Sequence, residues 1–255
     1  MLLVIDVGNT NTVLGVFEGK HLIVDWRLVT EQNQTADEYG ILARNLFALA
    51  NMEVSKIHHI IIASVVPPLN SVLEEMAEKY FKIKPLFVEP GIKTGMPVLY
   101  DVPADVGADR IVNAVAAYEK YGGPAIVVDF GTATTFDAIS ASGQYLGGVI
   151  APGPGISAEA LFTKTARLPR VEIKAPLKVI GTSTIGSIQS GIYYGYLGLI
   201  DGILGRMIPE LGEKTVVIGT GGFALLFSRE SRGIQHIDEN LTLEGLRLIF
   251  EKNLK

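Results

Sequence analysis

The sequence has 255 residues, 48% apolar and 19% charged, enough to bury the core of one large domain or two smaller ones. A formal net charge of −5 without any run of lysine and arginine argues against a surface for nucleic acid or anionic membranes. The absence of cysteine excludes disulfides, thiolate metal sites and cysteine nucleophiles, and the four histidines lack metal-ligand spacing.

The first apolar stretch has no basic residues before it and reaches Asp6 too early for a secretory signal. No segment approaches the roughly 20 uninterrupted apolar residues that a membrane-spanning helix needs. We therefore expect a cytoplasmic protein.

Residues 3–13, LVIDVGNTNTV, contain a pattern that returns at 126–136 as IVVDFGTATTF. Each apolar run predicts a buried strand, and the Asp-x-Gly segment after it predicts the turn of a hairpin. Glycine lets backbone amides approach a ligand, and amides and threonine hydroxyls bind phosphate oxygens. A merely polar turn is the alternative for either copy. Repetition favours a duplicated domain that holds a nucleotide between its halves.

The rest of the first half alternates strands and helices. Residues 22–29 predict a third strand, and Thr35 and Glu38 form a capping box that begins a helix ending near residue 50. A strand at 57–66, a helix at 69–81 and a strand at 86–88 follow. This order is typical of an α/β fold with a mixed sheet.

Residues 89–103 lack periodicity and predict a loop. The segment VGADR at 106–110 then begins an apolar helix that ends near residue 121 and precedes the second hairpin. A strand at 145–151, the glycine and proline segment at 152–155 and a helix at 157–165 come next. We place the boundary between two halves at residues 115 and 116.

Residues 185–211 predict one long helix with a glycine stripe on one face, formed by Gly191, Gly195, Gly198, Gly202 and Gly205. Each glycine costs roughly 1 kcal/mol relative to alanine, so close packing must compensate. The stripe could pack against a sheet of the same chain or across a dimer axis, and the pattern does not choose between them.

A strand at 215–218 leads to a glycine turn at 219–222, and an amphipathic helix at 241–253 follows. The turn is either a tight connection to the next helix or backbone that lies against a flat ligand such as adenine. Both interpretations stay open.

Three aspartates could take part in phosphoryl transfer. Asp6 and Asp129 end equivalent strands, and Asp6 suits a position near Mg²⁺, which prefers oxygen ligands. Transfer to a hydroxyl also needs a carboxylate that accepts its proton, for which Asp109 is our candidate. The alternative for Asp109 is a helix-start carboxylate paired with Arg110, and for Asp129 a residue that satisfies local turn amides. No Walker-type phosphate loop, protein-kinase catalytic loop or GxSxG motif occurs.

Over essentially its whole length the sequence resembles the type III pantothenate kinases, members of the superfamily of actin and the sugar kinases. The motifs in order are DVGNTN at 6–11, TADE at 35–38, SVVP at 64–67, GADR at 107–110, DFGTATT at 129–135, GPGI at 153–156, TARLP at 165–169 and TGG at 220–222. The resemblance implies two ribonuclease H-like, actin-like halves, residues 1–115 and 116–255, the second carrying dimerisation helices. It also implies a homodimer that phosphorylates pantothenate with ATP and Mg²⁺, the first step of coenzyme A synthesis.

The resemblance also implies roles for single residues. The ATP-binding residues would be Asp6, Val7, Gly8, Asn9, Thr10, Asn11, Thr12, Val13 and Thr132, with Asp6 near Mg²⁺. The pantothenate-binding residues would be Tyr100, Gly107, Ala108, Asp109, Arg110 and Thr184, with Asp109 as general base. Asp129 would help to hold K⁺ or NH₄⁺. The chemistry of Tyr100 and Thr184 does not by itself mark either residue as a substrate contact.

Two other functions compete with this one. A sugar kinase or a phosphatase of phosphate chains would keep both hairpins but place other polar groups around Asp109. A regulator of transcription would need a basic surface or an added DNA-binding segment, and the acidic sequence has neither.

Overall fold

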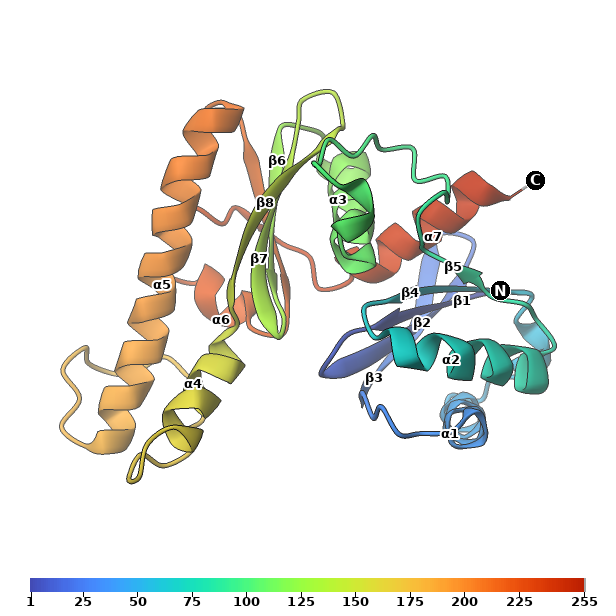
Figure 1. The fold of residues 1–255 in the computed structure, drawn as a ribbon, viewed down its shortest axis with the longest axis horizontal. Coiled ribbons are helices and arrows are strands. Elements are labelled where there is room, and N and C mark those ends of the chain that lie inside the picture. The colour runs from blue at the N-terminus through green and yellow to red at the C-terminus, as the bar shows by residue number, and fades with distance from the viewer. Residues whose placement is uncertain (255) are drawn as a thin grey trace. The chain divides into compact units, whose positions relative to one another are not determined.

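The computed structural model describes residues 1–254, which form two compact units (Figure 1). Unit 1 contains residues 1–96, 101–116 and 241–254, and unit 2 contains residues 97–100 and 117–240. The chain passes from unit 1 to unit 2 near residue 116, inside α3 (Ala108–Tyr121). The last helix, α7 (Leu241–Asn253), lies in unit 1 instead of the second half, because its leucines bury their apolar face on the sheet of unit 1.

The sheet of unit 1 has five strands in the order β3-β2-β1-β4-β5. These strands are β1 (Leu2–Val7), β2 (Asn11–Glu18), β3 (His21–Val29), β4 (His59–Ser64) and β5 (Leu86–Phe87). The first three are antiparallel neighbours, whereas β4 pairs in parallel with both β1 and β5.

The sheet of unit 2 has the order β10-β9-β6-β7-β8. Its strands are β6 (Ala125–Phe130), β7 (Ala133–Ile139), β8 (Tyr145–Pro152), β9 (Val216–Gly221) and β10 (His236–Ile237). Read from β8 to β10, the order and directions repeat those of unit 1, with β6 in the place of β1. The expected duplication of an α/β unit is therefore confirmed.

The hydrophobic core of each unit packs on the equivalent face of its sheet. In unit 1, Leu3 and Ile5 pack with α1 (Ala36–Leu49) and α2 (Asn70–Met76), and Figure 1 shows α7 on the other face of this sheet. In unit 2, Ile126 and Val128 pack with α5 (Thr184–Leu211) and α6 (Ala224–Ser228). Alternation along β1 and β6 therefore places each aspartate on the face opposite these helices.

Local signals fixed most element boundaries. Thr35 caps α1, with its Oγ1 accepting from Glu38 N at 3.3 Å while its own N–H donates to Glu38 Oε2 at 2.8 Å. The helix expected at 69–81 ends earlier, because α2 gives way to a π-helical turn at Ala77–Phe81. The helix expected at 157–165 is α4 (Pro154–Thr163), which begins earlier because proline is favoured in the first helical turn.

Two features at the end of unit 2 differ from expectation. Strand β9 continues through Gly219 and Thr220 to Gly221, so the glycine turn is shorter than predicted. The two-residue strand β10 was not predicted. Among residues 1–254, no helix is long and apolar enough to cross a membrane, and this includes the 28-residue α5.

Candidate active site

The first hairpin lies at the carboxyl end of two parallel strands. Asp6, the penultimate residue of β1, pairs with Val13 of β2 and with Ala63 of β4. Ligands of open α/β sheets bind outside the carboxyl ends of parallel strands. The turn that follows Asp6 therefore lies at the edge of the sheet where ligands of such folds bind.

Thr30, the residue after β3, holds this turn in shape. Its N–H donates to Thr10 O at 3.0 Å and its hydroxyl donates to Gly8 O at 2.7 Å. The buried Thr12 hydroxyl lies 2.9 Å from the Thr30 hydroxyl and is the donor of that pair, because the Thr30 proton is already used. Of the residues expected to bind ATP, Asn9 and Thr10 are exposed, whereas the Val7 and Thr12 side chains are buried. Sequence reasoning missed Thr30, whose only signal was a hydroxyl directly after the third strand.

The second hairpin is one residue tighter than the first. Gly131 N–H donates to Ala133 O at 3.0 Å, whereas in the first hairpin the Gly8 N–H bond reaches Asn11 O. Gly153 occupies the place of Thr30 and donates its N–H to Thr132 O at 2.9 Å. A Cβ at Gly153 would lie 2.3 Å from that oxygen, so the tighter turn requires glycine there. Thr132, the expected ATP contact, is exposed at the tip.

Asp129 is the penultimate residue of β6, as Asp6 is of β1, and it is partly buried. It pairs with Thr135 of β7 and Thr220 of β9. Gly221 has φ +87°, and a Cβ there would lie 2.5 Å from Asp129 Oδ1 and 2.7 Å from Phe130 N. Gly221 therefore leaves space for the Asp129 carboxylate, and this packing by itself accounts for a glycine at position 221. A Cβ at the neighbouring Gly222 would meet nothing within 4 Å.

Asp109 lies in the first turn of α3, at the same end of unit 1 as the first hairpin. Its Oδ1 accepts from the Arg110 N–H at 2.8 Å and lies 2.5 Å from where a Cβ on Gly107 would be. That Cβ position is 3.7 Å from Val65 Cγ1, and Val65 N–H donates to Val7 O at 3.0 Å. Burial raises the pKa of Asp109 above its ordinary value, although the Arg110 N–H opposes this shift. A carboxylate with a raised pKa is a stronger base.

The other expected substrate residues lie in different settings. Arg110 is buried in unit 1 and Ala108 is half-buried beside it. In unit 2, Tyr100 lies beside Tyr145 with ring centroids 6.4 Å apart. Thr184 is exposed as the first residue of α5, after the capping residue Ser183. Asp6, the first turn and residues 107–110 therefore belong to unit 1, while Asp129, Thr132, Tyr100 and Thr184 belong to unit 2.

Within residues 1–254, no group of three or more His, Cys, Asp or Glu side chains could hold a metal ion by itself. Asp6 and Asp129 each bring one carboxylate to the strand end that precedes a hairpin turn. Such donors fit cations that complete their coordination with phosphate, carbonyl and water oxygens. The residues are thus compatible with a cation shared with a bound nucleotide.

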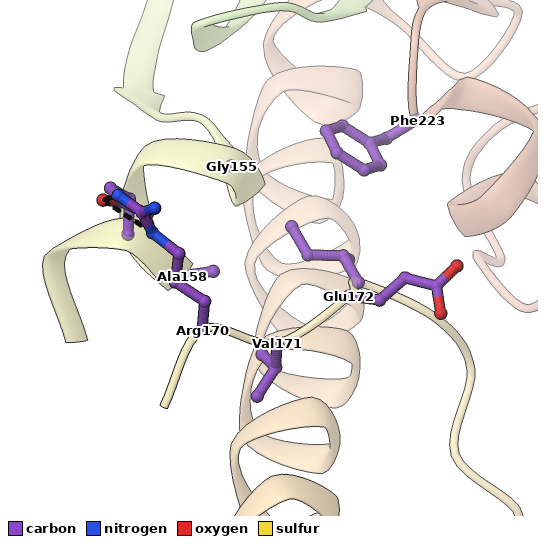
Figure 2. Close-up of a pocket in the computed structure, with 8 residues that line it drawn as sticks. Gly155, Ala158, Arg170, Val171, Glu172 and Phe223 are labelled. Carbon is purple, nitrogen blue, oxygen red and sulfur yellow. Dashed lines mark hydrogen bonds and ion pairs between the residues drawn. The ribbon is translucent and has the colours of Figure 1, made fainter. Parts of the chain in front are cut away.

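Unit 2 also contains a cavity of about 380 Å³ lined by α4, the segment 170–173 and Phe223, which follows β9 (Figure 2). Gly155, Ala158, Val171, Ile173 and Phe223 form its apolar lining. At its edge Arg170 makes an ion pair with Glu159, with Nη2 2.7 Å from Oε1. Glu172 also lines the cavity, so its wall combines apolar side chains with three charged ones. Ligand pockets commonly combine an apolar lining with a few polar groups.

Comparisons with known proteins identify the family. The type III pantothenate kinase family model matches residues 2–206. A type III pantothenate kinase from Koribacter versatilis is 62% identical over 99% of this chain and 96% of its own length.

Two solved structures agree in fold. A protein from Sinorhizobium meliloti described as a 2-dehydro-3-deoxygalactonokinase has a TM-score of 0.65 at 12% identity, covering 99% of this chain and 97% of that one. A protein from Campylobacter jejuni described as a Baf family transcriptional activator has a TM-score of 0.62 at 21% identity, covering 98% of both chains. The duplicated ribonuclease H-like fold, the ordered motifs and the family match agree, and the chain belongs to the type III pantothenate kinase family.

Proposed function

We propose that this protein transfers the γ-phosphoryl group of ATP to the terminal hydroxyl of pantothenate, the first step of coenzyme A synthesis. Family membership supports the reaction and the substrate. The observation that carries the proposal is the arrangement in unit 1, where a phosphate-type turn and a partly buried carboxylate of raised pKa lie at the same end of the sheet. We propose a cytoplasmic location for the reaction.

In this proposal the hydroxyl oxygen of pantothenate bonds to the γ-phosphorus, the bond from that phosphorus to the β,γ-bridging oxygen breaks, and ADP leaves. Asp109 accepts the proton of the attacking hydroxyl. Phosphoryl transfer depends mainly on positioning and charge stabilisation, so a single well-placed base suffices. Residues 107–110, Tyr100 and Thr184 bind pantothenate, and the amides and exposed side chains of residues 8–11 contact the phosphates. Thr132, in the second hairpin, also contacts ATP in this proposal. Val7 and Thr12, which are buried, shape the first turn from beneath.

Asp6 would lie near Mg²⁺, and Asp129 would help to hold a monovalent cation, K⁺ or NH₄⁺. When bound, these cations would supply positive charge that offsets the negative charge of the phosphates. The chain contributes the two carboxylates at equivalent strand ends, and Gly221 leaves space for the second one.

We place the adenine ring in the cavity that Phe223 lines. Two observations support this location: the apolar lining, and the start of the cavity at Gly155, two residues after the glycine that contacts the second hairpin. Aromatic and apolar side chains can stack on a base.

The test is ADP release by purified protein with Mg-ATP, with and without pantothenate, in K⁺ and then Na⁺ buffer, and with a panel of sugars. We expect release that depends on pantothenate and on K⁺. Release with a sugar alone, or equal release without pantothenate, would refute the proposal.

Asp129→Ala is expected to weaken activation by K⁺ specifically, because it removes a carboxylate that would contact the cation. The measurement is the K⁺ concentration dependence of ADP release at saturating substrates. Asp25→Ala, an exposed position on the edge strand β3, is the control and should keep the wild-type dependence. An unchanged K⁺ dependence in Asp129→Ala would remove Asp129 from this role.

A homodimer is part of the proposal, and the glycine stripe of α5 supports it. A Cβ at Gly191, Gly195, Gly198 or Gly205 would meet nothing within 4 Å, so the stripe faces open space in one chain. Packing against the sheet of the same chain therefore does not compensate for these glycines. Thr184 lies two helical turns before Gly191, on the same face. Ile180 and Ile185, beside Thr184, are exposed apolar side chains.

Gly198→Leu is expected to convert the dimer to a monomer. In one chain the new side chain has open space, and leucine favours a helix over glycine by roughly 0.8 kcal/mol, so the fold should persist. Across a closely packed dimer axis the same side chain would hold the helices apart. The measurement is molar mass by light scattering at micromolar protein.

Ser71→Leu adds a leucine to an exposed position of α2 and should leave the dimer intact. A wild-type monomer, or a Gly198→Leu dimer of unchanged dissociation constant, would contradict this interface.

A further inference from the structure

A short segment of the loop adds to the edge of the sheet of unit 2 and carries Tyr100. Tyr145 N–H donates to Pro97 O at 2.9 Å, and Leu99 N–H donates to Tyr145 O at 2.8 Å. Val98 and Tyr145 form an isolated parallel bridge, and β8 is the outermost strand on this side. Both backbone bonds use a single residue, Tyr145, so its position determines where the segment before Tyr100 lies.

The Tyr145 side chain is held by a hydrogen bond to β7, the neighbouring strand of the sheet. It is fully buried, and its hydroxyl donates to Asp137 Oδ1 at 2.8 Å. Asp137 is also fully buried, and its Oδ2 accepts from the Thr135 hydroxyl at 3.0 Å. A buried carboxylate is costly unless hydrogen bonds satisfy it, so this pair strongly prefers one geometry.

A β-bulge brings Tyr145 to this carboxylate. Ala138 pairs with Gly147, but Ile139 pairs with Tyr145, so the register skips Leu146. Without the skip, Leu146 would share a face with Ile139 and Asp137; with it, Tyr145 takes that place and Leu146 is 38% exposed. Bulges of this kind re-aim a side chain and are common next to active sites.

Tyr100 rests against this assembly. Its ring is tilted by 53° to the Tyr145 ring, and a Cβ at Gly147 would touch its ring carbons at 3.5 Å. The Tyr100 side chain is 37% exposed, so one side is packed and part remains accessible to a ligand. We propose that Tyr145, held by Asp137, is a positioning residue that fixes Tyr100 for pantothenate. This inference rests on the proposed function, in which Tyr100 binds pantothenate.

The Tyr145–Asp137 hydrogen bond is present without substrate. In this inference it keeps the segment that carries Tyr100 ordered in the free protein. Pre-ordering a binding group lowers the entropy cost of binding. Removing the bond should therefore weaken pantothenate binding and leave ATP binding and the transfer step largely unchanged. A purely structural role would instead change all three together, or only stability.

The experiment is a double-mutant cycle with Tyr145→Phe and Tyr100→Ala. Tyr145→Phe keeps the ring and deletes the donor, and we expect KM for pantothenate to rise about tenfold. In that variant kcat and KM for ATP should stay within about twofold of wild type. In the Tyr100→Ala background the same change should alter KM for pantothenate by less than about twofold, because Tyr145 acts through Tyr100.

Tyr193→Phe is the matched control. Tyr193 is a buried tyrosine of the same unit whose hydroxyl lies 3.0 Å from Glu230 Oε1, and its loss should leave KM for pantothenate unchanged. Asp137→Asn, of similar volume, tests the acceptor and should shift KM in the same direction as Tyr145→Phe.

Equal effects of Tyr145→Phe in the two backgrounds would overturn the inference. So would a Tyr100→Ala variant with wild-type KM for pantothenate, or a parallel change of KM for both substrates. Wild-type protein without any pantothenate-dependent ADP release would instead refute the proposed function itself, so the two failures are distinguishable.

Discussion

Asp109→Asn is expected to lower turnover by roughly 10² to 10⁴, the usual contribution of a positioned acid or base. The amide keeps the size of the side chain but cannot accept the substrate proton. ATP binding should stay close to wild type, because the residues proposed to contact the phosphates are elsewhere, in the two hairpin turns. The measurement is single-turnover ADP formation together with an ATP binding titration.

Asp105→Asn is the matched control, an exposed aspartate in the short 3₁₀ turn before α3, and it should turn over like wild type. The pH profile supplies a second check. Asp109 acts as a base only when deprotonated, and burial raises its pKa, so kcat/KM should fall as the pH drops through that raised value. Near wild-type turnover in Asp109→Asn would remove Asp109 from the role of base.

Gly221→Ala is expected to lower the free energy of unfolding by about 3 kcal/mol, from backbone strain and overpacking together. The backbone at φ +87° is unfavourable for alanine, and the new Cβ would lie 2.5 Å from Asp129 Oδ1 and 2.7 Å from Phe130 N. Because the backbone contact cannot relax easily, β9 and β6 must move apart at the point where Asp129 lies. The measurement is chemical denaturation of wild type and variant under identical conditions.

Gly222→Ala, one position later, is the control for stability. Its Cβ would meet nothing within 4 Å and its φ is ordinary, so the free energy of unfolding should change by less than about 0.5 kcal/mol. If the Gly221 and Gly222 variants unfold at the same denaturant concentration, the close packing of Gly221 on Asp129 is not a source of stability.

Much of the fold was predictable because its signals are local. The apolar runs that end in Asp-x-Gly define β1 and β6, the Thr35 capping box defines the start of α1, and α7 has the predicted bounds of 241 and 253. The roles of Tyr100 and Thr184, by contrast, came only from family resemblance. Neither residue type, tyrosine in a loop or threonine at a helix start, indicates a substrate by itself.

The amino-acid sequence by itself determined the two hairpins, the duplicated order of elements and the family, because strand, turn and cap preferences act within a few residues and recur as motifs. Tertiary structure alone decided which distant residues support the site. Thr30 braces the first turn, Gly153 fits the tighter second turn, and a one-residue bulge brings Tyr145 to Asp137. These contacts depend on strand register and backbone spacing across the sheet, and neither is encoded at any single position.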